Sequence, residues 1–164
     1  SRLDRGTSGA MTFAKSGYVH ELLRQQLHTA DFYKEYLAVC VGTPDPLCGV
    51  IDAPTGFAEG SRYKRAVCAN GVRSVTEYET LQSKNGLSLV RLVPRTGRMH
   101  QLRVHMAYIG CPLLGDWLYG EEAPALIDRP ALHAAYVRLK HPITGEVVEV
   151  RARLEGEMEG VWEE

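Results

Sequence analysis

The clearest hydrophobic period in the chain covers residues 18–30, where apolar side chains recur at steps of three and four positions. This spacing predicts an amphipathic helix, because it puts the apolar side chains on one face. The members of that face are Val19, Leu22, Leu23, Leu27 and Ala30. A second helix is predicted over residues 99–109, opened by Thr96 or Gly97 and ended by Gly110. Its apolar face comprises Leu102, Met106 and Ile109.

Runs rich in β-branched and aromatic residues predict strands along much of the remaining chain. They are residues 36–41, 75–81, 87–93, 132–140 and 146–153. Asn85-Gly86 predicts a tight hairpin turn between the second and third runs, and residues 142–145 a turn between the last two. Residues 43–60 hold three prolines and three glycines, so we expect a loop with little regular structure.

These elements favour the α+β class, with a mixed, mainly antiparallel sheet and a few helices. Strands and helices do not alternate as in a nucleotide-cofactor fold, and no glycine-rich phosphate loop is present. A length of 164 residues fits one domain with its own core. We expect this domain to span residues 1–153 and an acidic tail to span residues 154–164.

The distribution of charge is more informative than the net charge of −1. The acidic tail holds five glutamates and no base, and setting it aside leaves 19 basic and 15 acidic residues in the rest. Residues 80–115 contain no acid at all. Five bases fall there: Lys84, Arg91, Arg95, Arg98 and Arg103. A local basic field of this kind can hold phosphates, although an ordinary mixed surface is the alternative.

The four cysteines form no C-x-x-C pair, which is typical of reduced thiols in a cytoplasmic protein. His100, His105 and Cys111 come nearest to a metal-ligand cluster, but their spacing fits no structural zinc pattern, so we expect no metal. No apolar run approaches the roughly 20 residues that cross a bilayer, so no membrane segment is expected. The N-terminus lacks both an initiator methionine and the apolar region of a signal peptide, which suggests a piece of a longer chain.

Three short stretches carry candidate chemistry. Asp4 lies between Arg2 and Arg5 beside small, turn-forming residues, where cationic neighbours would keep its carboxylate ionised. The alternative there is a loop salt bridge. Tyr36 begins a strand, and packing is the simpler role for a tyrosine in that position. Polar residues crowd the second predicted helix, where a solvated helix face is the alternative, and they are Arg98, Gln101 and Arg103.

Four segments together resemble the RluA-type pseudouridine synthases. They read RLDRGTSGAMTFAKS, KEYLAVCVG, TGRMHQLRVHMAYIGCPLLGDWLYG and LHAAYVRLKHPITGE. The first resembles the family's catalytic-aspartate motif, the second its tyrosine strand, the third its arginine-bearing helix and following loop, and the fourth its C-terminal hairpin. Their order agrees with the family, as does the step of 32 positions from Asp4 to Tyr36.

The resemblance implies an isomerase that converts uridine to pseudouridine in ribosomal or transfer RNA, without cofactor or metal. It matches Asp4 to the essential aspartate, Tyr36 to the active-site tyrosine and Arg103 to the arginine that pairs with the aspartate. Arg2 matches the arginine that helps to displace the target base from its stack. The implied fold is a mixed sheet with a central active-site cleft. Further substrate-binding candidates are Arg5, Arg95, Arg98, His100 and Gln101, and further phosphate contacts are Arg62, Lys64 and Arg65.

Two departures from the family pattern stand at the N-terminus. Ser1 occupies the place where the family usually has His, and the family's upstream strand segment has no counterpart, so we expect an N-terminally incomplete catalytic domain. We expect a cytoplasmic monomer. Two other hypotheses remain open at this point. One is a catalytically incomplete RNA-binding module of the same fold, and the other is a small hydrolase in which a histidine hydrogen-bonds to Asp4.

Overall fold

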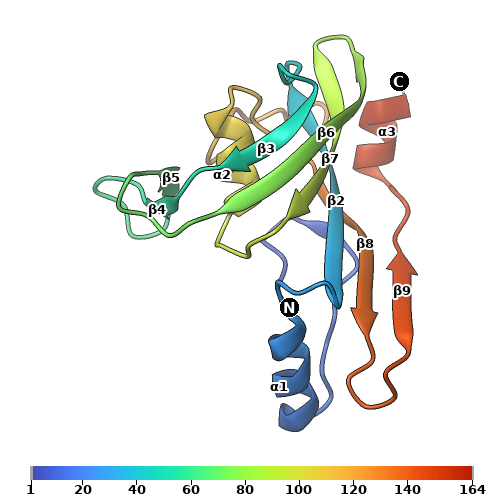
Figure 1. Ribbon diagram of the computed structural model, residues 1–164. Coiled ribbons are helices and arrows are strands. Elements are labelled where there is room, and N and C mark those ends of the chain that lie inside the picture. The colour runs from blue at the N-terminus through green and yellow to red at the C-terminus, as the bar shows by residue number, and fades with distance from the viewer. Residues whose placement is uncertain (1, 164) are drawn as a thin grey trace.

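A mixed sheet forms the centre of the fold in the computed structural model, which describes residues 2–163 (Figure 1). Ser1, the departure from the family motif, lies outside the described residues, as does Glu164. Within the described range the sheet has seven strands in the order β1-β8-β2-β7-β6-β3, with β9 also paired to β8. Their bounds are β1 Ser8–Gly9, β2 Phe32–Val41, β3 Cys48–Asp52, β6 Val75–Lys84, β7 Leu87–Pro94, β8 Leu132–Lys140 and β9 Val147–Arg151.

Only the two-residue strand β1 runs parallel to its neighbour, β8, among the pairs that the structure describes; the rest are antiparallel. Three helices accompany the strands in residues 2–163: α1 Gly17–Gln26, α2 Gln101–Tyr108 and α3 Glu157–Glu163. The predicted α+β class, with a mixed and mainly antiparallel sheet, is confirmed.

Both predicted hairpins are present. Strands β6 and β7 meet at Lys84 and Leu87, and Asn85 and Gly86 between them have φ angles of 51° and 78°. Positive φ at both central residues is what a tight turn between twisted strands requires. The second hairpin joins β8 to β9, with Lys140 paired to Val147.

The predicted loop over residues 43–60 is wrong in part. Strand β3 pairs along its whole length with β6, and β4 (Thr55–Phe57) pairs with β5 (Arg65–Val67) in a separate hairpin. The prolines of this region, Pro44, Pro46 and Pro54, all fall outside the strands, so they interrupt pairing without preventing it. In Figure 1 the β4–β5 hairpin extends away from the sheet as an arm.

Helix α1 begins where Ser16 accepts a hydrogen bond from the backbone N–H of Val19, as an N-cap does. It ends at Gln26, four residues before the predicted end, because Leu27 adopts an extended ψ of 134° and His28 a positive φ of 66°. On its apolar side, Leu23 and the following Leu27 pack against a small cluster of buried residues. That cluster comprises Phe32, Val137 and Leu139.

Helix α2 covers one face of the sheet, with Leu102 and Met106 in the main core beside Tyr36. Ile109 packs on the same cluster, so the predicted apolar face is confirmed. The helix begins at Gln101, two residues after the predicted start. Thr96 does not cap it, since its hydroxyl instead ties the preceding loop to the sheet by accepting from the N–H of Val75.

The acidic tail contains helix α3, which packs against the other side of the core. Met158 is fully buried and Trp162 nearly so, in a cluster with Val39, Leu114 and Ile127. The indole N–H of Trp162 donates to a side-chain oxygen of Gln82. No helix among residues 2–163 is both long enough and apolar enough to span a membrane.

Candidate active site

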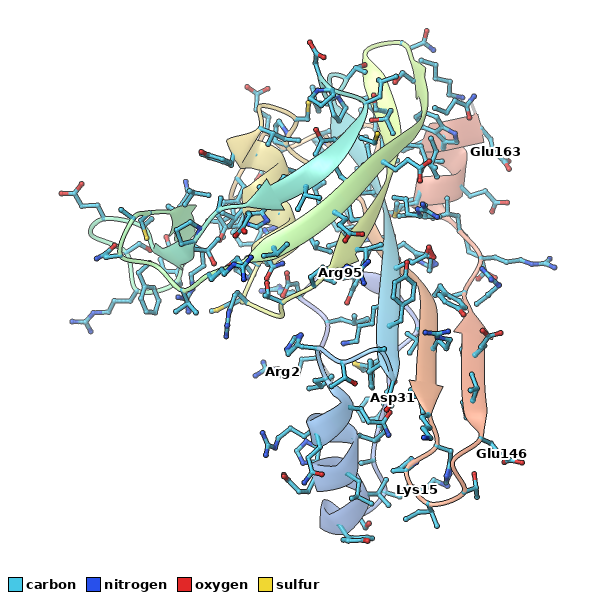
Figure 2. The ribbon with its side chains drawn as sticks, in the orientation of Figure 1. Arg2, Lys15, Asp31, Arg95, Glu146 and Glu163 are labelled. Carbon is cyan, nitrogen blue, oxygen red and sulfur yellow. The ribbon has the colours of Figure 1, made fainter. Side chains whose placement is uncertain are left out.

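A cleft of about 990 Å³ opens between the N-terminal segment, strand β2 and the loop before α2. Eight of the nine predicted site residues line it, although they come from three separate parts of the sequence: Arg2, Asp4, Arg5, Tyr36, Arg95, Arg98, His100 and Gln101. The ninth, Arg103, is buried and does not line the cleft. In Figure 2, the labelled Arg2 and Arg95 both lie above helix α1, with Arg95 next to the sheet.

Asp4 is held at the start of a tight turn, in which the N–H of Thr7 donates to its carbonyl oxygen at 2.9 Å. The chain then enters β1, where Ser8 and Gly9 pair with His133 and Ala134 of β8. This attachment fixes the turn against the sheet and leaves the Asp4 side chain half-buried at the cleft. The arrangement therefore presents a carboxylate on a rigid support.

Tyr36 reaches the cleft from the middle of β2, at a bulge in the pairing of β2 with β8. Its ring is 8% exposed and belongs to the main core. Burial, together with the negative charge of Asp4, raises the pKa of the Tyr36 hydroxyl to about 12. Tyr36 is thus a protonated phenol at neutral pH, with Asp4 close enough for their charges to interact.

The predicted ion pair between Arg103 and Asp4 needs correction. Arg103 is 2% exposed, and its guanidinium donates two parallel hydrogen bonds to Asp116, from Nε and Nη2, each of 2.8 Å. Burial lowers the pKa of Arg103, but the bonds with Asp116 and the charge of Asp4 outweigh it and leave the pKa raised. Asp4 therefore interacts with Arg103 only electrostatically, whereas Asp116 binds the guanidinium directly through two parallel hydrogen bonds.

Asp116 is fully buried and also organises the loop that follows it. Its Oδ1 accepts from the backbone N–H groups of Leu118 at 3.1 Å and Tyr119 at 3.2 Å. The preceding Gly115 has a φ of 72°, and a Cβ there would meet the carbonyl oxygen of Arg129 at 2.5 Å. Only glycine fits where these two backbone segments approach so closely, and this approach places Asp116 next to Arg103.

His100 stands at the end of the loop before α2 and contacts Tyr119 from that second loop. Its Nδ1 lies 2.7 Å from the Tyr119 hydroxyl, and the two rings meet edge to face at 5.6 Å between centroids. Burial lowers the pKa of His100, and the charge of Asp4 partly offsets this. No histidine among residues 2–163 hydrogen-bonds to the Asp4 carboxylate, so the contact that a hydrolase would need is not found in that range.

Gln101 lines the cleft but is 3% exposed, and its amide is fully engaged by the protein. The oxygen accepts from the hydroxyl of Thr96 and the N–H of Arg98, and the nitrogen donates to the carbonyl of Val75 and the hydroxyl of Thr76. With all of these positions occupied, Gln101 anchors the loop before α2 instead of facing a ligand.

The arginines of the cleft differ in how free they are. Arg95 is paired at 2.8 and 2.9 Å with Glu77. Arg98 is exposed, and its Nε contacts the carbonyl of Arg73 at 3.4 Å. Arg2 and Arg5 are exposed and form no salt bridge with any residue in the described part of the chain. They are the guanidinium groups most available to an anion.

The β4–β5 arm adds cations and rings beside the cleft. The Arg65 guanidinium stacks 3.8 Å from the Phe57 ring centroid, and the Lys64 ammonium lies 5.9 Å from that of Tyr119. Arg62 and Tyr63 are exposed in the loop between the two strands. Basic and aromatic side chains interleaved in this way suit a nucleic-acid backbone with unstacked bases.

Asp116 and Tyr119 are the residues of this site that sequence reasoning did not single out. Both lie in the segment GDWLYG, which ends the third of the four motif segments. An aspartate after a glycine, three positions before a tyrosine, was the available signal. Among the described residues no group of three His, Cys, Asp or Glu side chains is placed to hold a metal ion.

Comparison with known proteins matches this chain to RNA pseudouridine synthases. The family model for RNA pseudouridylate synthases matches residues 1–108. An uncharacterized RNA pseudouridine synthase of Bacillus subtilis, YhcT, is 40% identical over 162 residues, which are 98% of this chain and 53% of the relative. Ribosomal large subunit pseudouridine synthase D of Vibrio cholerae is 38% identical over 170 residues, covering 96% of this chain and 52% of that protein.

A solved structure agrees with these sequence matches. Human RNA pseudouridylate synthase domain containing 1 superposes with a TM-score of 0.80 at 31% identity, over 93% of this chain and 67% of that one. The chain spans about half the length of the curated relatives it matches.

Proposed function

This chain belongs to the RNA pseudouridylate synthase family, as its resemblance to the RluA-type members predicted, and we propose on that premise that it converts uridine to pseudouridine in RNA. The observation that carries the proposal is the cleft, which gathers Asp4, Tyr36 and the exposed arginines around one carboxylate. The reaction breaks the N1–C1′ bond, turns the uracil and joins it again through C5. Because the base stays in the site, the reaction needs an enclosed pocket.

In this proposal Asp4 acts on the ribose of the target nucleotide. Its carboxylate adds to C1′, or it removes the proton at C2′ to give a glycal, and either route uses the ionised form. The half-buried position at the cleft fits both routes. Arg103 lies close enough for its charge to interact with that of Asp4, and Asp116 keeps that guanidinium in place.

We assign Tyr36 to the detached base. Its ring offers an aromatic face to the uracil, and its hydroxyl stays protonated at neutral pH because the pKa is raised to about 12. Tyr36 therefore contributes as a hydrogen-bond donor in the resting state. It takes part in removing the C5 proton only after passing on its own proton, directly or through water.

The RNA contacts follow from which cations are free. Extruding a uridine from a stem costs a few kcal/mol, and Arg2 offsets part of this by entering the vacated place. Arg5 and Arg98 at the cleft, with Arg62, Lys64 and Arg65 on the β4–β5 arm, contact phosphates. Arg95 contributes less, because Glu77 already neutralises it. Gln101 supports the loop that carries Arg98.

The remaining expectations belong to the same proposal. The substrate is ribosomal or transfer RNA, residues 1–153 form the catalytic unit, and the protein is a monomer that needs no cofactor. A cytoplasmic location is supported by four free cysteines in the described structure.

Tritium release from RNA labelled at uracil C5 tests this proposal. The unmodified chain releases tritium, whereas Asp4→Asn folds, binds the same RNA and releases none. Full release by Asp4→Asn contradicts the role of Asp4. RNA binding without release by the unmodified chain would instead favour the second candidate, an RNA-binding module of the same fold. The basic and aromatic side chains of the β4–β5 arm favour this candidate, because they suit RNA binding without any reaction at Asp4.

A further inference from the structure

His100 has a backbone conformation that its side chain does not favour. With φ of 57° and ψ of 17° it lies in the left-handed region, where a Cβ is unfavourable and glycine is the usual residue. Such a conformation persists only where the surroundings enforce it, and it recurs at functional sites. His100 also lines the cleft, although its ring is only partly exposed.

The hydrogen bonds of Tyr119 bear on which ring nitrogen of His100 carries the proton. The backbone N–H of Arg65 donates to the Tyr119 hydroxyl oxygen at 2.9 Å. That oxygen lies 2.7 Å from Nδ1 of His100, and because it already accepts from Arg65, its own proton is free to fill this contact. If the hydroxyl donates, Nδ1 accepts, and the proton of a neutral ring must sit on Nε2.

We propose that Tyr119 holds His100 as the neutral tautomer protonated on Nε2, and that this N–H donates a hydrogen bond to an acceptor oxygen of the target nucleotide beside Asp4. The inference rests on the proposed function, because it assumes that a nucleotide occupies the cleft. It makes His100 a substrate-contacting residue and Tyr119 the positioning residue behind it.

The surroundings support a neutral donor. Burial lowers the pKa of His100, and the charged groups that act on it, Asp4, Arg103, Asp116 and Arg65, comprise two of each sign. Among the described residues no hydrogen bond to Nε2 is formed, so this nitrogen is the one available to the cleft. Asp116 fixes the other end by accepting from the backbone N–H of Tyr119. The same carboxylate therefore positions both Arg103 and, through Tyr119, His100.

Replacing His100 by glutamine and by asparagine distinguishes the roles of its two ring nitrogens. The Gln side chain can place its NH₂ where Nε2 stood, whereas the shorter Asn reaches only the place of Nδ1. We expect His100→Gln to keep kcat within about tenfold, and His100→Asn and His100→Ala to lose on the order of 100-fold, as for a donor aimed at a reacting group. The matched controls are His20→Gln and His20→Asn on helix α1, outside the cleft. Equal losses for His100→Gln and His100→Asn would overturn the proposal.

The tautomer itself is measured without substrate. Long-range proton–nitrogen NMR correlations of the unmodified chain should show His100 protonated on Nε2 alone, and Tyr119→Phe should yield a mixture of both tautomers. A charged ring, or a proton on Nδ1, contradicts the inference even if the chain is active. Because this readout needs no catalysis, it stands apart from failure of the proposed function.

Modified RNA then identifies the acceptor. Three kinds of oxygen on a target nucleotide can accept this hydrogen bond: a uracil carbonyl, the ribose 2′-hydroxyl and a neighbouring phosphate. We compare the unmodified chain with His100→Ala on RNA carrying 2-thiouridine, 4-thiouridine or 2′-deoxyuridine at the target, and on RNA with a methylphosphonate beside it. The contact lies on the group whose replacement removes most of the His100→Ala penalty. A penalty that none of the four replacements reduces refutes a contact with the nucleotide.

Discussion

Breaking the buried pair between Arg103 and Asp116 should destabilise the protein far more than breaking a surface pair of the same chemistry. Both side chains are almost without exposure, at 2% and 0%. Removing one partner of such a pair costs about 3–5 kcal/mol, because a charge is left buried and unpaired. In Arg103→Ala the orphaned Asp116 keeps two backbone N–H donors, so we expect about 3 kcal/mol, near the lower end. Asp116→Ala also loses those two bonds and should reach about 5 kcal/mol.

Urea denaturation followed by circular dichroism measures these losses. At roughly 2–4 °C per kcal/mol for a chain of this size, the melting temperature of Arg103→Ala should fall by about 6–12 °C. The matched control is Arg73→Ala, which breaks a two-pronged contact with Asp52 whose side chains are 76% and 47% exposed. An exposed pair contributes little, so this variant should unfold close to the unmodified chain.

A double replacement separates stability from function. Arg103→Met with Asp116→Leu removes both charges, so it should recover the part of the loss that comes from an unpaired buried charge. It should keep the part that comes from the backbone N–H groups of Leu118 and Tyr119, which lose their acceptor. It should not recover pseudouridine formation, since the positive charge behind Asp4 is gone. If Arg103→Ala unfolds no more readily than Arg73→Ala, the buried pair between Arg103 and Asp116 contributes no more stability than an exposed one.

Three further predictions follow from burial. Tyr36 should titrate near pH 12, so an ultraviolet titration of Tyr36→Phe should lose one late-ionising tyrosine. Since the pKa of Tyr36 in the folded protein exceeds the ordinary value of 10, the free energy of unfolding should also fall as the pH rises from about 10 to 12. If Tyr36→Phe instead loses an early-ionising tyrosine, the raised pKa of Tyr36 is contradicted. His105 bonds to Thr76 and the Ala53 carbonyl, and burial lowers its pKa. The folded protein therefore favours the neutral form of His105, and the stability that this form contributes is present above pH 6.5 and lost as the pH falls below it. Urea midpoints should fall less between pH 7.5 and 5 in His105→Gln than in the unmodified chain. An equal fall in both proteins would count against a role of His105 in this pH dependence. Met158→Ala should lose about 2–5 kcal/mol by urea denaturation, because Met158 is fully buried; a loss as small as that of an exposed change such as Glu159→Gln would show that helix α3 does not stabilise the core.

Local patterns in the sequence predicted most of the sheet. The β6–β7 hairpin follows from Asn85-Gly86, a signal contained in two adjacent residues, and helix α1 follows from a period visible within three turns. Strands β3 and β4 were missed because proline and glycine around them indicate loops. Their pairing depends on partners outside that segment, which a local pattern does not contain.

The candidate site shows the same division between local and distant information. Short motifs identified the side chains that line the cleft, but not which of them pair. Arg103 was matched to Asp4, whereas its fork holds Asp116, thirteen positions further along the chain. That choice depends on Gly115 and on how the loop approaches α2 in space. Tyr119 was missed for the same reason, since its role in the site depends on hydrogen bonds with Arg65 and His100, which are distant in the sequence.

Transcriptome-wide mapping of pseudouridine tests whether the Asp4 carboxylate carries the reaction in cells. Cells that lack the gene are compared with cells carrying either an unmodified copy or one with Asp4→Asn. We expect at least one uridine to be modified only with the unmodified copy, while both proteins accumulate to the same level. Restoration of that pseudouridine by Asp4→Asn would contradict a cleft built around the Asp4 carboxylate.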